Sequence, residues 1–250
     1  MDYDIAGDSH VGSVRQSNQD RVEWRRSEDG RQALLVLADG MGGHQGGEIA
    51  SQLAVASVLD SLLPSLSSYE VPEAATVRER LDAAFDLASM RIREEQGNDA
   101  RLEKMGTTLL VAWIIDSTAF IGHIGDSRCY LISQAGPRCL TRDDTVVQNM
   151  IEDGSITEAE APRVPFRNVL TRAVGASDDS MPSFRIQELA PGEGLLLCSD
   201  GLTGALPESH WPELIGSGPD AGDAVQALIE QSLENGAGDN VSVVLMMVKD

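Results

Sequence analysis

The segment LADGMGGHQGGEIAS, residues 37–51, places one acid, Asp39, directly before five glycines within eight residues. The apolar run ALLVL ahead of it predicts a buried strand, and an amphipathic helix is expected behind it. A glycine-rich turn between a strand and a helix often binds phosphate, because its bare N–H groups approach an anion closely. An acid at the start of such a turn repels phosphate, so the segment raises the question of what Asp39 binds.

Apolar runs rich in leucine and β-branched residues, each bounded by turn residues, predict strands along the chain. These strands are expected at 33–38, 107–115, 119–125, 128–133, 184–189, 194–199 and 241–248. Apolar residues at three- and four-residue steps predict helices from Ile49 to Leu63, from Val77 to Ile92 and over 221–234. The sequence between the first two helices, 61–75, is interpreted as a loop, and 145–180 as a short helical and irregular stretch.

The order of these elements predicts an α+β fold. One strand is followed by two long helices, a block of strands, the irregular stretch, and then strand, helix and strand. This order lacks the regular βαβ alternation of a doubly wound parallel sheet and favours antiparallel sheet packed under helices. No Pro/Ser-rich linker and no repeat interrupts the sequence, so residues 1–250 are expected to form a single domain.

The composition excludes several classes of function. The 250 residues carry 40 Asp and Glu against 19 Lys and Arg, a formal charge of −21. A general nucleic-acid binder, or a protein that docks on anionic membranes, needs a basic face instead. The N-terminus lacks the basic and apolar regions of a secretory signal, and no apolar run approaches the roughly 20 residues that span a bilayer. Cys129, Cys139 and Cys198 have no CxxC spacing and fit packing residues in a reducing compartment, so a cytoplasmic protein is expected.

Four acids share one layout, an apolar strand followed by Asp beside glycine, serine or asparagine. They are Asp39 in LADGMGG, Asp126 in HIGDSRCY, Asp200 in LCSDGL and Asp239 in GAGDNVSVV. Each alone fits an ordinary turn residue. Four carboxylates that converge at strand ends, most of them without a neighbouring Lys or Arg, need a cation to offset their repulsion.

An all-oxygen ligand set without a His/Cys pattern indicates Mg²⁺ or Mn²⁺ rather than zinc. A phosphate would then meet the metal instead of Asp39. The glycines would let the chain turn tightly enough for a backbone carbonyl, that of Gly40, to join the coordination.

Other ligand sites have weaker support. The glycine-rich turn has neither a GxGxxG register nor a following Gly-Lys-Ser/Thr, so a nucleotide loop fits poorly. His44 and His123 lack an HExxH context and are interpreted as ordinary polar or packing residues. The segment VRQSNQDR, 14–21, offers Arg15 as a fork for a phosphoryl dianion and Asp20 as an acid that could hold metal-bound water. By itself, this segment equally fits a solvated polar loop.

Together these segments resemble the metal-dependent protein phosphatases, the protein phosphatase 2C-like family, in its compact bacterial form. The resemblance runs from Arg15 to Val248, and ADGMGGHQGGEIAS is its most specific part. The motifs that carry it, in family order, are RQSNQDR, ADGMGGHQGGEIAS, GTT, GDSRCY, LTRDDT, LTRAVG, CSDGL and GDNVSVV. The resemblance implies a sandwich of two antiparallel sheets flanked by paired helices, with a dinuclear metal cleft at one edge.

The resemblance also implies a role for each acid in metal binding. Asp39 would bridge two Mn²⁺ or Mg²⁺ ions, and the carbonyl of Gly40 would bind one of them. Asp200 and Asp239 would complete the pair, and Asp20 would contact the ions through water.

Further roles follow from the same resemblance. Asp126 matches the acid that, in bacterial members, helps Asp200 to hold a third, weaker ion. Arg15 would grip the substrate phosphate, and residues 146–169 take the place of the family's variable flap. The bridging ions would supply a hydroxide that attacks phosphorus in line, so no covalent phosphoenzyme is expected.

The sequence departs from the family pattern at two positions. Met41 stands where animal relatives have a histidine proposed as the general acid, and bacterial members commonly share the methionine. Asp144 stands where many relatives have histidine. The proton donor to the leaving group is therefore unassigned, with Asp144 among the candidates.

The activity implied is that of a protein-serine/threonine phosphatase, a monomer that acts on phosphoproteins and reverses a bacterial Ser/Thr kinase. It would need neither nucleic acid nor membrane insertion. An alternative is a non-catalytic phosphoprotein-binding scaffold, a pseudophosphatase, on the same fold, although the complete set of acids weighs against it. Phosphatases of sigma-factor pathways usually carry attached sensor domains, and a calcium module would need the twelve-residue EF-hand spacing. The charge of −21 predicts partners with basic surface near the phosphosite, and hence a salt-dependent KM.

Overall fold

Two antiparallel sheets form the centre of the chain in the computed structural model, which describes residues 2–43, 45–68, 71–177 and 181–249. The first sheet has the strand order β1-β11-β10-β7-β8, and the second has the order β2-β3-β5-β6-β9, with β4 paired to β3. The first sheet comprises β1 (Tyr3–His10), β7 (Arg128–Ile132), β8 (Arg138–Cys139), β10 (Gly194–Cys198) and β11 (Val241–Val248). The second comprises β2 (Asp20–Arg26), β3 (Gln32–Met41), β4 (Gly106–Thr107), β5 (Leu109–Ile115), β6 (Thr118–Ile124) and β9 (Ser183–Glu188). All of these pairings are antiparallel.

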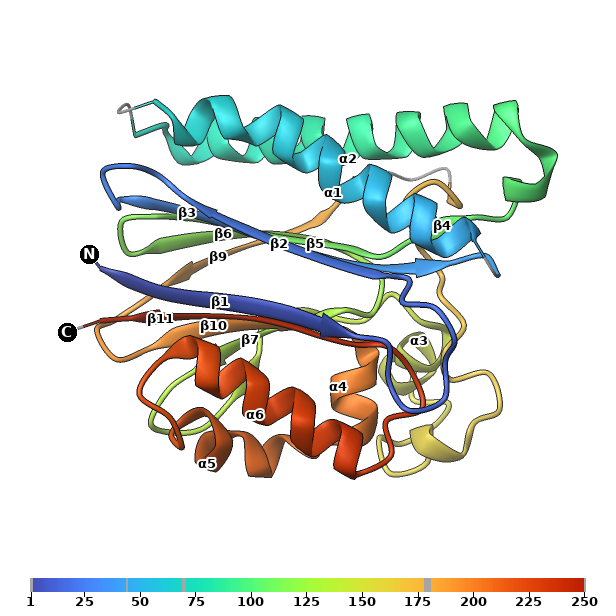
Figure 1. The fold of residues 1–250 in the computed structure, drawn as a ribbon. Coiled ribbons are helices and arrows are strands. Elements are labelled where there is room, and N and C mark those ends of the chain that lie inside the picture. Colours follow the sequence, from blue (N-terminus) through green and yellow to red (C-terminus); the bar gives the residue numbers. More distant parts are fainter. Residues whose placement is uncertain (1, 44, 69–70, 178–180, 250) are drawn as a thin grey trace.

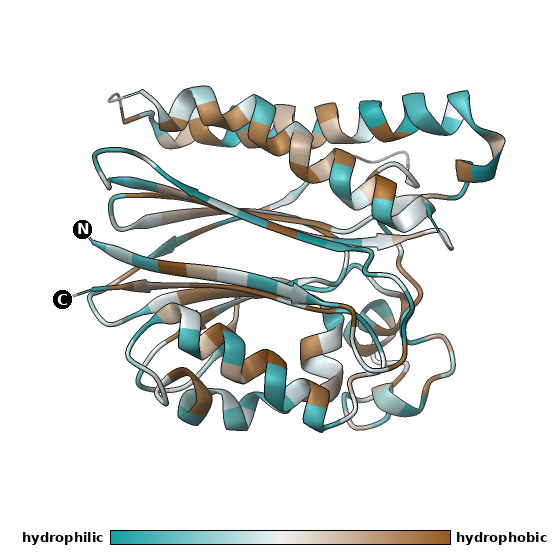
Figure 2. Cartoon of the chain, viewed as in Figure 1, coloured by the Kyte–Doolittle hydropathy of each residue, from teal (hydrophilic) through white to brown (hydrophobic). Residues whose placement is uncertain are grey.

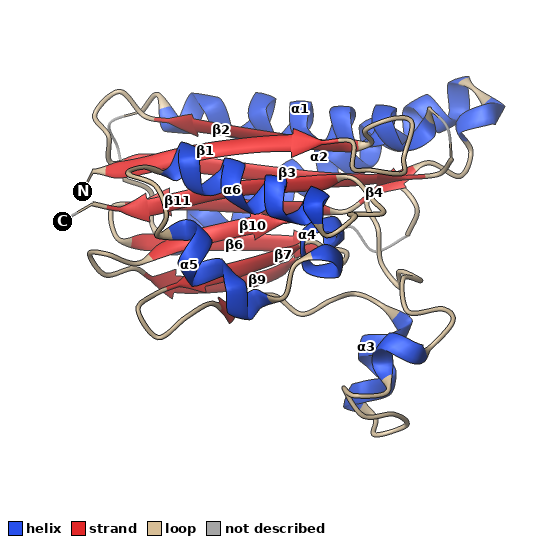
Figure 3. Ribbon diagram, turned by 60° about the horizontal axis from the view of Figure 1, so that its bottom comes forward, coloured by secondary structure: helices blue, strands red, loops and turns tan. Residues whose placement is uncertain are grey.

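Helices cover the outer faces of the two stacked sheets, which gives four layers (Figure 1). On the second sheet lie α1 (Gly46–Leu66) and α2 (Ala74–Asn98), and under the first lie α4 (Asp200–Ala205), α5 (Trp211–Ile215) and α6 (Ala221–Glu234). The short α3 (Val146–Glu152) projects beyond the ends of the strands (Figure 3). Single-turn helices occupy Ala100–Leu102, Ala161–Arg163 and Glu208–His210. The predicted α+β sandwich of antiparallel sheets and flanking helices is confirmed.

Buried apolar side chains fill the space between each pair of layers, as β3 illustrates. Its residues Leu34 and Val36 pack towards α1 and α2, whereas Leu35 and Leu37 pack towards the first sheet. Both faces of β3 are therefore buried, which explains why the run ALLVL is continuously apolar although its sheet is antiparallel. Figure 2 shows apolar residues along the strands and hydrophilic residues on the outward turns of the helices.

The predicted helices are confirmed, but the loop between the first two is shorter than expected. α1 continues to Leu66 and keeps Pro64 inside its final turns. Leu62 and Leu66 are buried in the core beneath this end of the helix. Their burial offsets the hydrogen bond that proline removes, so the loop prediction for 61–75 is wrong over its first six residues.

The sequence does not predict the two edge strands β1 and β2. Their sequences, YDIAGDSH and DRVEWRR, contain glycine and many charged residues, and most of their side chains are only half-buried or exposed. Such strands lack the apolar alternation that identifies a strand buried on one or both faces. The strand predicted at 107–115 is present but interrupted at Thr108, between β4 and β5.

α1 is a described helix that is long and apolar enough, by length and composition, to cross a membrane, with a mean hydropathy of 1.4. The expectation that no segment approaches such a span is corrected at this point. α1 packs against α2 and β3 and contributes Ala50, Ala54 and Val58 to the core. Its apolar face is therefore used in the packing of this fold.

Candidate active site

The acids identified at strand ends come together at one end of the sandwich. Asp39, Asp126, Asp200 and Asp239 line one cavity of about 700 Å³, together with Arg15 and Gly40. Asp20 is buried at the start of β2, directly opposite Asp39 in the β2–β3 pairing. The fold therefore gathers residues from both sheets, although they are spread over most of the sequence.

Two threonines of the GTT motif hold the backbone of Asp39 in place. The N–H of Asp39 donates to Thr108 Oγ1 at 2.9 Å. Its carbonyl accepts from the Thr108 N–H and from Thr107 Oγ1, both at 2.8 Å. These bonds replace regular strand pairing where β4 and β5 are interrupted, so the end of β3 is fixed at the residue that reaches the cavity.

The glycines on either side of the turn allow β3 and α1 to approach backbone to backbone. A Cβ on Gly40 would lie 2.0 Å from the carbonyl oxygen of Gly47 and 2.7 Å from that of Gln19. A Cβ on Gly47 would in turn lie 2.7 Å from the Gly40 carbonyl. The tight approach keeps Gly40 at the cavity wall, and any larger residue would push the strand and the helix apart.

A chain of hydrogen bonds positions Asp20 behind Asp39. The side-chain amide of Asn18 donates to Ser9 Oγ at 2.7 Å, and Ser9 Oγ lies 2.7 Å from Ser242 Oγ. Ser242 Oγ donates to Asp20 Oδ2 at 2.6 Å. Asp20 Oδ1 is buried and has no hydrogen-bond partner among the described residues. Burial raises the pKa of Asp20, despite the bond from Ser242.

Burial and mutual repulsion raise the pKa values of the acids in the cavity. Burial, followed by the charges of Asp20 and Asp200, raises the pKa of Asp39 well above its usual range. Burial and the charge of Asp239 raise the pKa of Asp200 to about 6. Burial and the charge of Asp200 raise the pKa of Asp126 to about 7. The protein by itself therefore leaves the negative charge at this site under-compensated.

A hard divalent cation fits this arrangement in charge and in donor chemistry. The donors are carboxylate and carbonyl oxygens, which suit Mg²⁺ or Mn²⁺. The free Oδ1 of buried Asp20 shows that the polar environment is incomplete without a further partner. Within the described ranges no three Asp, Glu, His or Cys side chains converge into a ready-made metal-binding group, so the acids surround the cavity rather than one point.

Arg15 forms an ion pair with one acid of the cavity. Its Nη2 lies 2.7 Å from Asp239 Oδ2, while Asp239 Oδ1 accepts from the Asn240 N–H at 2.9 Å. The Asn240 side chain holds the loop that carries Arg15, because it donates to the carbonyls of Val11 and Ser17 at 2.8 and 3.0 Å. The GDN motif thus supplies both an acid and a clamp, and sequence reasoning identified only the acid.

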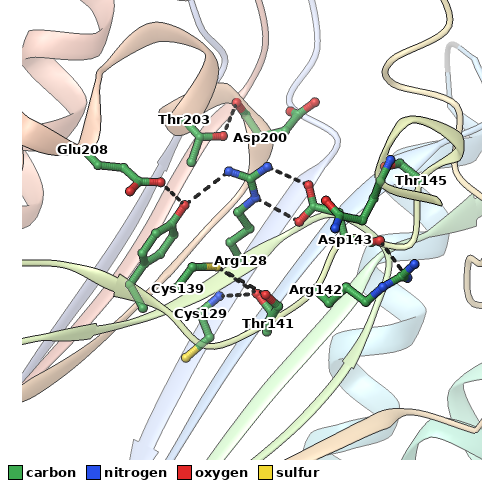
Figure 4. Close-up of polar contacts among 12 residues, drawn as sticks. Arg128, Cys129, Cys139, Thr141, Arg142, Asp143, Thr145, Asp200, Thr203 and Glu208 are labelled. Carbon is green, nitrogen blue, oxygen red and sulfur yellow. Dashed lines mark hydrogen bonds and ion pairs between the residues drawn. The ribbon is translucent and has the colours of Figure 1, made fainter. Parts of the chain in front are cut away.

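A second cation lies near the other acids of the cavity (Figure 4). Arg128 binds both oxygens of Asp143, at 2.9 and 2.7 Å, and donates to the Tyr130 hydroxyl at 3.3 Å. Tyr130 donates in turn to Glu208 at 2.6 Å. Arg128 lowers the pKa of Asp200, but by less than burial raises it. Sequence reasoning missed this cation because its partners lie in three separate segments.

The remaining predicted residues have structural surroundings. The carboxylate of Asp144 accepts from the Gly125 N–H at 3.0 Å and lies 3.5 Å from Arg172, outside the lining of the cavity. Asp144 therefore supports the turn before Asp126 and is not placed to protonate a leaving group. His123 is buried and has no hydrogen-bond partner among the described residues, which fits a packing role. His44 lies outside the described residues.

The cysteines have the surroundings expected of packing or surface residues. All three are free, with Cys129 and Cys198 buried in strands and Cys139 exposed. Burial raises the pKa of Cys129 and of Cys198, so neither is a thiolate at neutral pH.

The segment 146–169 leaves the sandwich and returns beside the cavity. Its ends are tied by the bridge between Thr145 and Leu170 and by the bond from the Val146 N–H to the Val169 carbonyl at 2.9 Å. Asn168 and Val169 line the cavity. Between its two ends, the segment forms α3 and the single-turn helix at Ala161–Arg163 (Figure 3).

Comparison with known proteins gives consistent matches over almost the whole chain. Residues 6–235 match the protein family described as protein phosphatase 2C. The protein phosphatase PhpP of Streptococcus pneumoniae is 34% identical over 240 residues, which cover 96% of this chain and 95% of PhpP. The crystal structure of the Mycobacterium tuberculosis serine/threonine phosphatase PstP/Ppp superimposes with a TM-score of 0.87 at 34% identity and full coverage of both chains. A structure of the PstP catalytic domain in complex with two manganese ions gives a TM-score of 0.83 at 35% identity, with 99% of each chain covered.

Proposed function

This chain belongs to the protein phosphatase 2C family, and we propose that its acidic cavity is the active site for metal-dependent hydrolysis of phosphoserine and phosphothreonine in proteins. One observation carries the proposal. Four carboxylates with mutual repulsion line the same cavity as an arginine, which is the combination that a metal-assisted phosphoryl transfer needs. The structure of a relative with two manganese ions supports the same choice of metal.

The residues would divide into those that hold ions and one that binds phosphate. Asp39, the Gly40 carbonyl, Asp200 and Asp239 would hold two Mn²⁺ or Mg²⁺ ions, and Asp20 would act through water. When bound, the ions would supply a hydroxide at neutral pH and offset charge on the phosphoryl oxygens.

Two further residues would complete the site. Asp126, with Asp200, would hold a weaker third ion, because both acids line a neighbouring cavity of about 590 Å³ as well. The Arg15 guanidinium is half-exposed at the cavity and would bind two oxygens of the substrate phosphate. Met41 lines the cavity but cannot donate a proton, so the leaving group would take its proton from water.

The remaining assignments concern the chain as a whole. Residues 1–250 would form one catalytic domain, with 146–169 as a flap beside the cleft. The protein would act in the cytoplasm as a monomer and would reverse a cognate Ser/Thr kinase. The free, largely buried cysteines are consistent with a reducing compartment.

Phosphate release from a phosphothreonine peptide tests the proposal. We expect release with Mn²⁺ or Mg²⁺, loss of release in excess EDTA, and nearly complete loss in Asp39→Asn and Asp239→Asn. Cys198→Ala should keep most activity per folded molecule, because no cysteine nucleophile is used. Loss of activity only in the cysteine variant would overturn the mechanism. A folded wild-type chain that binds Mn²⁺ and phosphopeptide without releasing phosphate would favour the scaffold alternative.

A further inference from the structure

A second cavity continues from the active-site cavity across the glycine-rich turn. It has a volume of about 680 Å³ and lies between the start of α1 and the end of α2, and we call it the α1–α2 cavity. Gln16, Ser17, Gly42 and Gly43 line both cavities. A Cβ on Gly43 would meet no atom within 4 Å, so the shared wall is open at this residue. A substrate segment that leaves the active-site cavity on this side enters the α1–α2 cavity.

The α1–α2 cavity combines apolar and acidic side chains. Ile49 and Leu102 supply apolar surface, and both pack on the core beneath. Asp99 and Glu95 supply carboxylates from the end of α2. Asp99 is neutralised by Arg101, whose Nη2 lies 2.6 Å away. Glu95 is half-buried, and its carboxylate makes no hydrogen bond or ion pair within the described part of the chain.

A lysine or arginine side chain complements these surfaces. Its aliphatic stem would cover Ile49 and Leu102, and its charged end would reach the carboxylate of Glu95. An acidic side chain would be repelled by Glu95, and an aliphatic one would leave this carboxylate without a partner. The positive end of α1 lies at Gly46, and Glu48 in the first turn offsets it.

On the basis of the proposed phosphatase function, we infer that the α1–α2 cavity binds a lysine or arginine side chain of the phosphoprotein, near the phosphorylated residue. An extended peptide advances about 3.3 Å per residue, so positions within three residues of the phosphothreonine are the ones to vary. The charge of −21 favours the approach of such basic segments. The recognised substrate class is then phosphoproteins with a basic residue beside the phosphosite.

The test compares peptides that differ in one side chain. A phosphothreonine peptide with glutamine at all six flanking positions is compared with six peptides that carry a single arginine at one of them. The Mn²⁺-loaded full chain should hydrolyse at least one arginine peptide with a kcat/KM about two- to fivefold higher, the range expected for one half-exposed ion pair. Glu95→Gln should abolish this preference, and Glu95→Arg should reverse it towards a glutamate peptide.

The matched control is Glu94→Gln. Glu94 precedes Glu95 on α2 but is exposed and does not line the cavity, so its variant should keep the wild-type preference. Hydrolysis of p-nitrophenyl phosphate, which is too small to reach the α1–α2 cavity, should be equal in all these variants and shows that each is folded. Equal rates on all peptides, or the same change in both glutamine variants, would overturn the inference while leaving the proposed function intact. A wild-type chain that hydrolyses neither the aryl phosphate nor any peptide would refute the proposed function itself.

Discussion

Replacing Gly40 by alanine should separate the strand that carries Asp39 from the helix that follows it. The new Cβ would lie 2.0 Å from the Gly47 oxygen and 2.7 Å from the Gln19 oxygen, so backbone obstructs it on two sides. Reaching ordinary van der Waals contact with Gly47 requires a shift of roughly 1.4 Å. Overpacking against side chains costs about 1–3 kcal/mol, and two backbone obstacles place this variant at about 3 kcal/mol or above.

Gly97→Ala is the matched control for this substitution. Gly97 lies in the last turn of α2, and a Cβ there would meet nothing within 4 Å. Alanine should therefore stabilise the helix by about 0.5 kcal/mol. Urea unfolding followed by far-ultraviolet circular dichroism measures both effects, and phosphate release at low urea measures the displacement of Asp39. We expect Gly40→Ala to lose at least tenfold in kcat/KM even where it is folded. A Gly40→Ala variant within 1 kcal/mol of wild type and with unchanged kcat/KM would refute the close-approach argument.

Two further predictions concern charges in the cavity. Burial and the charge of Asp200 raise the pKa of Asp126 to about 7, so its ionisation costs stability as the pH rises from about 4 through 7. In EDTA, Asp126→Asn should raise unfolding stability by about 1–3 kcal/mol at pH 8 and by little at pH 4, and an equal gain at both pH values would contradict this. Arg15→Ala frees a carboxylate oxygen of Asp239, so calorimetry should show tighter Mn²⁺ binding, while kcat/KM for a phosphopeptide falls about 10- to 100-fold. Arg21→Ala, whose partner Glu48 lies outside the active-site cavity, should change neither, and unchanged or weaker Mn²⁺ binding in Arg15→Ala would refute the competition.

The acids were predictable because the signal for each lies within a few residues of sequence. An apolar run that ends at Asp and glycine identifies a strand end, and the ends of neighbouring strands lie together in a sandwich. Asp39, Asp126 and Asp200 meet this condition, and all three line one cavity. The helices were equally predictable, since α1, α2 and α6 bury one apolar face at regular spacing.

The partners that orient these acids could not be read from local sequence. Ser242 donates to Asp20 across 222 positions, and Arg15 binds Asp239 across 224. A serine or an arginine carries no sequence pattern that specifies a partner so far away, and only the closing of β1 onto β11 brings them together. Edge strands such as β2 are missed for a related reason, because strand pairing supplies the stability that their own apolar content lacks.

The same distinction explains the glycines of the opening segment. In a phosphate-binding loop, glycine is required because an anion approaches the backbone. In this chain the constraint at Gly40 and Gly47 comes from each other's backbone, and at Gly42 it comes from a φ of +121° and from Met105, whose Cα would lie 2.6 Å from an added Cβ. The composition of the turn therefore follows from the close approach of β3 and α1. That approach leaves Asp39 at the cavity wall, and an acid is tolerated there because the glycines do not have to hold the phosphate.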